Sequence, residues 1–352
     1  MSLLEERYRY VLRLLPASYR AEREEEMVCA FLEGSGGLRD EDNPRPRWSE
    51  IASVVALSVR VRLGGSGAPL RSLAWGEAVR LTATLGLFFH AMMACVYFGS
   101  SLEIYGIFGT GDPTLLGAAG SPERLWDIAQ GVGGLLWVAA FASLVLGRTR
   151  AAKASALLAV ALYYGSALRG EAVRWDEGTK ALILHGVLYV VPVLALLAGF
   201  HRDAPRTHRP RWVAALPVGA GAPLYVILKV LNSMALAPVI DLRFWSWVWP
   251  WLGELGLACL ALVVASVTCV GTRMRAPGGR TASLPLALAI LTVPVTLVRA
   301  ADLTFQAVDP ITRTMEAVNA GQLAALLVCG VTLVVLGVRA LPPLPRPVPS
   351  SP

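Results

Sequence analysis

The sequence predicts an all-α protein, a polytopic transmembrane helical bundle preceded by a small helical prefix. Hydrophobic residues make up 55% of the chain and charged residues only 16%, and the mean hydropathy is +0.55. Charged residues reach roughly a quarter of a typical soluble domain. Eight apolar stretches also approach the length of about twenty residues that a helix needs to cross a bilayer. The loops between them alternate between Arg-rich and Arg-poor.

Residues 1–70 form the predicted cytoplasmic prefix and its linker. Apolar side chains recur at helical spacing from Leu4 to Leu15, and Pro16 ends this first helix. Ser18 is a candidate cap for a second helix that runs to Leu32, and Ser49 is one for a third that runs to about Val61. Three short helices bury only a small core, so the unit is expected to pack against the membrane, the inner loops of the bundle or a protein partner. A plain topogenic anchor and a docking domain are both compatible with residues 1–65.

A loose motif in the prefix carries a resemblance to a known kind of domain. It consists of Tyr8-Arg9-Tyr10-Val11-Leu12-Arg13-Leu14-Leu15-Pro16, then Tyr19-Arg20 and Glu25-Glu26-Met27. This motif resembles the short N-terminal helical prefix of many actinobacterial polytopic membrane proteins, and it is similar to the permease prefix and to a related signalling domain. The resemblance covers about residues 1–65. It implies a membrane protein of a transporter-accessory or signalling kind and names no substrate.

The bundle is expected over residues 71–340, where the backbone must be helical because an unpaired amide in hydrocarbon costs several kcal/mol. The eight predicted spans are residues 79–98, 125–146, 151–168, 181–200, 212–231, 252–270, 284–298 and 318–338. Most of the 32 Lys and Arg residues fall in the prefix and in alternate loops. The positive-inside rule therefore places both termini in the cytoplasm of a bacterial inner (plasma) membrane.

We attribute the net charge of +7 mainly to the excess of Lys and Arg on the predicted cytoplasmic side of the membrane. Nucleic-acid binding is not expected, because the basic residues lie in short loops beside the membrane rather than on one soluble face. Residues 341–352 form a Pro-rich tail that is expected to be extended.

Ionisable side chains inside apolar spans are candidates for function, because each one costs several kcal/mol in hydrocarbon. In the predicted topology, six of them fall in the outer part of the bundle, so the sequence predicts an outward-facing polar cluster that binds a small ligand. Its hydrogen-bonding neighbours are expected to include Gln130, Tyr163, Tyr164, Asn232 and Gln306. The six candidate ligand-binding residues are His90, Asp127, His185, Lys229, Glu254 and Asp302.

The residue types in this cluster favour two pairings. Glu254 with Lys229 would make an ion pair between the fifth and sixth spans, and His90 with His185 would make a proton-responsive or metal-binding pair. The alternative is structural: Asp127, Lys229 and Asp302 snorkel to the interface, while the histidines make interhelical hydrogen bonds. His90 and Glu254 are the strongest candidates for a functional role.

The segment from Asn232 to Trp251 is predicted to be an outer loop in the headgroup layer, because Phe244-Trp245-Ser246-Trp247-Val248-Trp249-Pro250-Trp251 has the composition of an interfacial aromatic belt. A stacking site for a sugar or lipid headgroup is an alternative reading. The five cysteines include no CxxC and are read as packing residues.

Catalytic signatures are missing from the sequence. It contains no GxxxxGK[ST] loop, HExxH helix or GxSxG elbow, so no cofactor or metal is expected and ATP hydrolysis would need another chain. The favoured function is a non-catalytic permease-like or transport-accessory component with the lipid bilayer as its main surroundings. The alternative is a membrane sensor that relays an envelope signal through the prefix, and an intramembrane enzyme ranks third. Transport would need a polar path through the bundle, whereas sensing would not.

Overall fold

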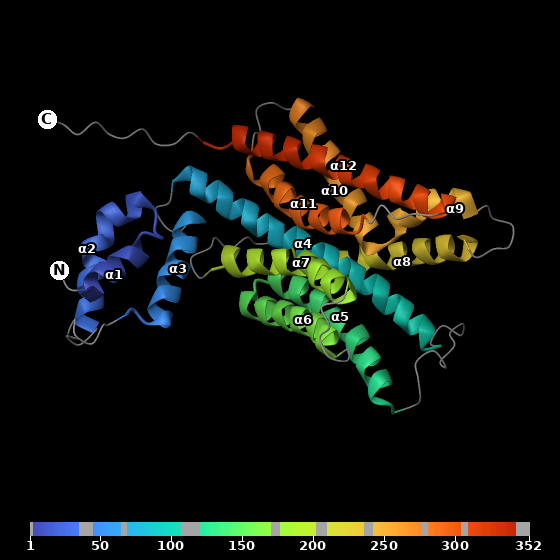
Figure 1. The fold of residues 1–352 in the computed structure, drawn as a ribbon, viewed down its shortest axis with the longest axis horizontal. Helices are drawn as coiled ribbons and strands as arrows, with labels where there is room; N and C mark the ends of the chain where they lie inside the picture. The colour runs from blue at the N-terminus through green and yellow to red at the C-terminus, as the bar shows by residue number, and fades with distance from the viewer. Residues whose placement is uncertain are drawn as a thin grey trace. The chain divides into compact units, whose positions relative to one another are not determined.

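The structure is a computed structural model, and it describes residues 3–34, 45–64, 69–106, 120–169, 177–201, 210–235, 242–275, 281–303 and 309–342. Throughout these residues the regular structure is helical, as the sequence predicts (Figure 1). The chain divides into two compact units, one made mainly of Met1–Glu77 and the other of Ala78–Phe200 with Pro205–Ala340.

The first unit contains the predicted prefix helices as α1 (Leu3–Leu12), α2 (Ala17–Gly34) and α3 (Trp48–Arg62). The predicted starts of α2 and α3 are slightly wrong. Helix α2 begins before Ser18, and α3 begins at Trp48 because Glu50 reaches back to accept a hydrogen bond from the Arg47 backbone amide at 2.7 Å. Helix α1 ends at Leu12, earlier than predicted, and turn hydrogen bonds carry the chain from Arg13 to Leu15 before Pro16.

A small core holds the prefix helices together. Its buried side chains are Tyr8, Leu12, Leu15, Val28 and Val54. The ring of Tyr8 stacks on Phe31 with the centroids 3.8 Å apart, which joins α1 to α2. The Ser58 hydroxyl in α3 donates to the Leu14 carbonyl at 2.6 Å, so the chain after α1 is tied to α3 as well. The prefix therefore has a core of its own.

The second unit is a bundle made mainly of long apolar helices. Its helices are α4 (Leu70–Ile104, whose first turns belong to the first unit), α5 (Pro122–Val145), α6 (Thr149–Arg169), α7 (Glu177–Gly199), the 3₁₀ helix η3 (Arg211–Ala215), α8 (Leu216–Ala235), α9 (Leu242–Leu252), α10 (Glu254–Arg275), α11 (Ser283–Ala301) and α12 (Pro310–Arg339).

All eight predicted spans are helical in the structure, and six helical segments among the described residues are long and apolar enough to cross a membrane. These six lie in α4, α5, η3 with α8, α10, α11 and α12. The third predicted span is α6, whose Ala-rich sequence and Lys153 leave it less apolar than the six. The fourth is α7, whose apolar part spans only Ile183–Gly199 among the described residues. The architecture is thus compatible with an integral, multi-pass membrane protein.

Helix α4 lies between two hydrophobic cores of the bundle. In Figure 1 it crosses between α5, α6 and α7 on one side and α10, α11 and α12 on the other. The first core joins α4 to α5–α7 and is rich in alanine, with Ala83, Ala91, Ala140, Ala152 and Ala156 all buried. The second joins α10, α11 and α12, and Leu85 and Phe89 of α4 pack against it. In a membrane, burial of apolar surface does not drive helices together, so their association depends on close packing. Small residues such as alanine allow this close approach.

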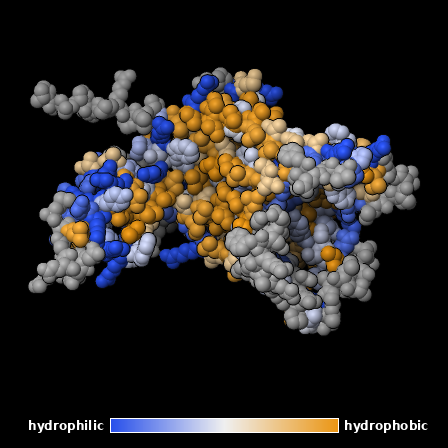
Figure 2. All heavy atoms as spheres, viewed as in Figure 1, coloured by the Kyte–Doolittle hydropathy of each residue, from blue (hydrophilic) through white to orange (hydrophobic). Residues whose placement is uncertain are grey.

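The outward faces of these helices are also apolar. Figure 2 shows apolar side chains gathered over a broad area of the bundle. Large hydrophobic side chains are exposed on successive turns of several helices: Leu157, Leu158, Leu194, Val226, Ile227, Val230, Leu260, Val264, Val267, Val293, Leu297, Leu327, Val328, Val331 and Val334. Apolar patches this extensive are not left in water by monomeric proteins. They suit contact with lipid.

The aromatic segment that the sequence assigns to an outer loop is a helix. Helix α9 covers Phe244 to Trp251, and its Trp245 is buried while Phe244 and Trp247 are exposed. The sequence-based expectation of a loop was wrong, because an aromatic composition typical of the membrane interface does not distinguish a loop from a helix. Aromatics at helical spacing allow one side of α9 to pack against the bundle while the other faces outward.

Candidate functional site

A carboxylate inside the bundle, Glu254, is the centre of the candidate site. It is the first residue of α10, where the exposed amides of a helix N-terminus favour a negative charge. Its side chain is 17% exposed and accepts hydrogen bonds from two tyrosines on other helices. The Tyr97 hydroxyl of α4 donates to Oε2 at 2.9 Å, and the Tyr189 hydroxyl of α7 lies 3.2 Å from Oε1 and 3.1 Å from Oε2. The carboxylate therefore joins three helices.

The imidazole of His90 completes this cluster. Its Nε2 lies 3.1 Å from the backbone oxygen of Leu188, which can only accept a hydrogen bond, so Nε2 carries a proton. Its Nδ1 lies 3.6 Å from Oε1 of Glu254, and the His90 side chain is only 5% exposed. If both groups lacked a further proton, the Nδ1 lone pair would face a carboxylate. Nδ1 makes no hydrogen bond within the described part of the chain, so a second proton on the imidazole would face the Glu254 carboxylate and form an ion pair with it.

Aromatic rings surround this pair on one side. The centroid of the His90 ring lies 4.6 Å from that of Tyr189 and 5.1 Å from that of Trp137. Tyr163 continues the group, with its ring centroid 4.6 Å from that of Tyr189. These residues come from α4, α5, α6 and α7, so the aromatic cluster depends on the packing of four helices. Their faces provide an apolar surface with negative electrostatic potential beside the carboxylate.

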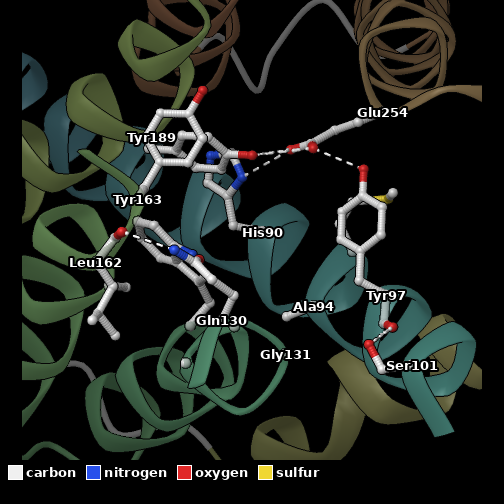
Figure 3. A pocket seen from close by; sticks show the side chains of 15 residues that line it. His90, Ala94, Tyr97, Ser101, Gln130, Gly131, Leu162, Tyr163, Tyr189 and Glu254 are labelled. Carbon is white, nitrogen blue, oxygen red and sulfur yellow. Dashed lines mark hydrogen bonds and ion pairs between the residues drawn. The ribbon is translucent and has the colours of Figure 1, made fainter. Parts of the chain in front are cut away.

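The His90–Glu254 pair and these rings line a cavity of about 350 Å³ (Figure 3). Figure 3 shows Glu254 reaching toward His90 and Tyr97, with Gln130 on the opposite wall. Gln130 donates from Nε2 to the Leu162 carbonyl at 3.2 Å. Glycines of α5 at 131, 133 and 134 also line the cavity, and the absence of side chains there leaves room between α4 and α6. We call this space the aromatic cavity.

A second cavity, of about 680 Å³, lies on the other side of Tyr97 and Glu254, which line both. Its charged groups include an ion pair between Lys229 of α8 and Glu103 at the end of α4, with Nζ and Oε1 2.9 Å apart. The Tyr225 hydroxyl donates to the same carboxylate at 2.9 Å. The Tyr97–Glu254 hydrogen bond thus forms part of the partition between two polar spaces.

Arg299 of α11 also lines the second cavity and is 5% exposed. Its Nη1 donates to Oδ1 of Asn319 in α12 at 2.9 Å. Its Nε and Nη2 make no hydrogen bond with protein atoms of the described part of the chain. A buried guanidinium with unused donors is costly, and water or a polar ligand in the cavity would satisfy them.

The predicted polar residues gather at one end of the bundle, but their partners differ from the predicted ones. Lys229 pairs with Glu103 rather than with Glu254. His90 faces Glu254, whereas His185 lies 3.9 Å from Asp302, so the two histidines are engaged with different carboxylates. Both sequence-based pairings were therefore wrong. The side chain of Asp127 and the whole of Gln306 lie outside the described residues.

Several residues of the site were not predicted from the sequence. Glu103 and Tyr97 lie at or beyond the end of the predicted first span, and α4 continues to Ile104. Tyr189, Trp137 and Arg299 sit inside or at the end of apolar spans, where each is explained equally well by packing or by the membrane interface. Only their contacts with His90, Glu254 and Asn319 distinguish them. Among the described residues, no group of three or more His, Cys, Asp and Glu side chains is arranged to hold a metal ion.

Comparisons with known proteins give no match to this chain among protein-family models, curated proteins or solved structures. The geometry of the cluster is therefore the basis for a functional assignment.

Proposed function

We propose that this chain is a permease-like, non-catalytic protein of a bacterial inner membrane that binds a small ligand in the aromatic cavity. In this proposal all eight helical stretches cross the membrane, both termini are cytoplasmic and the polar end of the bundle faces outward. The apolar outer faces of the helices and the distribution of Lys and Arg support this arrangement.

The observation that carries the proposal is a buried carboxylate whose partners come from several helices and which faces a cavity. A purely structural carboxylate in a bundle would be expected to be enclosed by its partners. Glu254 instead lines two cavities while it is held by Tyr97, Tyr189 and His90. Ligand sites commonly combine an apolar aromatic lining with a few oriented polar groups.

A panel of small cations, anions, zwitterions and neutral compounds tests the proposal on the full-length protein in mild detergent. At least one class should raise the melting temperature, because a ligand that binds only the native state stabilises it. Gly134 lines the cavity, and a Cβ placed there would lie 4.0 Å from Ala94, so Gly134→Leu should fold and fill the space. This variant should lose the response.

The matched control is Gly219→Leu, because Gly219 is a bundle glycine with no atom within 4 Å of a Cβ built on it and it does not line the aromatic cavity. It should keep the response of the unmodified protein. A panel without any stabilising compound, or an equal response in the Gly134 and Gly219 variants, would contradict the proposal.

A membrane sensor is the second candidate, and the separate core of the prefix favours it. Helices α1–α3 form a unit with buried Tyr8, Leu12 and Val54, and Tyr10 and Trp48 are exposed on it. A prefix that resembles permease-prefix and signalling domains would dock a cytoplasmic protein. Pull-down with the intact chain and with a chain lacking residues 1–65 separates the two functions. Recovery of a regulator by the intact chain alone favours sensing, and recovery of a transport ATPase favours a transport accessory.

A further inference from the structure

We propose that the aromatic cavity binds a monovalent organic cation, and that this cation competes with one proton for the His90–Glu254 pair. This inference rests on the proposed ligand-binding function and adds the class of ligand and its coupling to protons.

The first step is the proton count of the empty site. Nε2 of His90 is fixed as a donor by the Leu188 carbonyl, while Nδ1 makes no hydrogen bond within the described residues and lies 3.6 Å from Oε1 of Glu254. We place one further proton between these two atoms, because without it the Nδ1 lone pair would face a carboxylate. The hydroxyls of Tyr97 and Tyr189 both point to the carboxylate and stabilise its charged form. The extra proton is therefore on His90, and the empty site is an imidazolium–carboxylate pair.

The lining of the aromatic cavity beside this pair favours a cation. Among the described residues, the charged or titratable ones that line the aromatic cavity are His90, Tyr97, Tyr163, Tyr189 and Glu254, and the tyrosines are neutral. Once His90 is neutral, Glu254 carries the one formal charge among these lining residues. Trp137 and the tyrosine rings add faces that attract a cation lacking a tight hydration shell. An anion would meet the carboxylate and the negative ring faces.

Binding of the cation and release of the proton balance in charge. When the cation enters, its charge replaces that of the imidazolium beside Glu254, and Nδ1 of His90 releases its proton to water. Nε2 keeps its proton and its bond to Leu188. One cation is bound for each proton released, so the net charge of the site does not change, which avoids placing an additional charge in a medium of low dielectric constant.

Charged groups on the far side of Glu254 do not alter this exchange. Glu103 and Lys229 are paired with each other across the second cavity, and Asp302 is paired with His185. Arg299 lines the second cavity but not the aromatic one. It remains positively charged over the pH range in which a histidine titrates.

The test uses phenyltrimethylammonium and its neutral isostere tert-butylbenzene, titrated into the full-length protein in mild detergent. Calorimetry in two buffers with different ionisation enthalpies counts the protons released. At acidic pH the cation should bind with release of close to one proton, and over the pH range in which one proton is released its affinity should fall about tenfold for each unit by which the pH is lowered. The isostere should bind much more weakly.

Three variants locate the effect. Glu254→Gln should lose cation binding, whereas Glu103→Gln, which alters the carboxylate of the second cavity, should retain it. His90→Gln should bind the cation without releasing a proton and with little dependence on pH.

Three results separate the possible failures. Equal binding of the isostere and the cation, blocked in Gly134→Leu, would overturn the cation inference and leave ligand binding intact. Cation binding without proton release would overturn the exchange. No binding of either probe, together with no response to any compound of the wider panel, would overturn the proposed function itself.

Discussion

Nδ1 of His90 lies 3.6 Å from Oε1 of Glu254, and the two residues belong to helices α4 and α10 on different parts of the chain. Tyrosines from α4 and α7 complete the hydrogen bonding of the carboxylate. The interaction thus links the α4–α7 side of the bundle to the α10–α12 side. Its loss should affect both stability and ligand binding.

Replacing Glu254 by Gln should destabilise the bundle by about 3 kcal/mol, because it breaks a buried pair and leaves the proton on His90 without a counter-charge. Unfolding of the purified protein by increasing SDS in mixed micelles measures this change. Glu103→Gln is the control, since the side chains of Glu103 and Lys229 are 30% and 42% exposed and their ion pair should contribute much less than the buried pair. Equal losses in both variants would show that the His90–Glu254 pair has no special role in stability.

Close contact between α4 and α7 should make Gly86 intolerant of a side chain. A Cβ at this position would collide with the ring of Pro192, which is fully buried. Gly86→Ala should therefore lower stability by about 1–3 kcal/mol, the usual range for overpacking.

Gly219→Ala is the matched control for Gly86→Ala. Nothing lies within 4 Å of a Cβ at Gly219, so its stability should stay the same or rise by up to about 1 kcal/mol because alanine favours the helix. A similar change in both variants would mean that α4 and α7 do not approach as closely as described.

The stacked rings of Tyr8 and Phe31 should decide whether the prefix stays folded. Phe31→Ala should cost about 3–5 kcal/mol if the core cannot collapse around the cavity, and this is a large share of the stability of so small a unit. Limited proteolysis of the full-length protein should then cut within α1–α3. Tyr10→Ala, at a residue that is 71% exposed, should leave the digestion pattern unchanged. Resistance of the Phe31 variant would show that the ring pair is dispensable.

The prefix should also weaken in acid. Hydrogen bonds from the Arg9 guanidinium, 2.7 and 2.9 Å from the carboxylate oxygens, hold the pKa of Glu25 below its ordinary 4.5. A carboxylate with a lowered pKa in the folded state stabilises the fold above its unfolded pKa, and this contribution is lost as the pH falls through the folded value.

Hydrogen exchange in α1 and α2 tests this pH dependence. Protection should be greater in the unmodified protein than in Arg9→Met at neutral pH, and the difference should disappear well below pH 4.5. Because both side chains are partly or fully exposed, the difference should be small and should shrink in high salt. A difference that persists in acid would assign the effect of Arg9 to packing of its alkyl chain.

Much of the fold could be predicted from the sequence, because membrane spans need long apolar runs and short helices are bounded by helix-terminating residues such as Pro16. The extra turn that carries Glu103 was harder to predict, since helix ends beyond the apolar core lack a hydropathy signal. Tyr97 lies inside the predicted first span, but its hydrogen bond to Glu254 could not be predicted. The aromatic segment of α9 was misassigned because its composition suits an interface loop and a packed helix equally. His90, His185, Lys229, Glu254 and Asp302 could be placed at one end of the bundle, but not paired. Pairing depends on the rotation of each helix about its axis, which uniformly apolar sequences do not define.

The most direct test of the proposed outward-facing cavity is to determine from which side of the membrane a reagent reaches it. Two variants would be labelled with a membrane-impermeant maleimide in intact cells: one keeps Cys29 as its single cysteine, and the other lacks all five native cysteines and carries Ser101→Cys. Cys29 is exposed on the prefix, and Ser101 lines the cavity. We predict that Ser101→Cys reacts from outside, whereas Cys29 reacts only after the membrane is opened. Reaction of both thiols from the same side would contradict it.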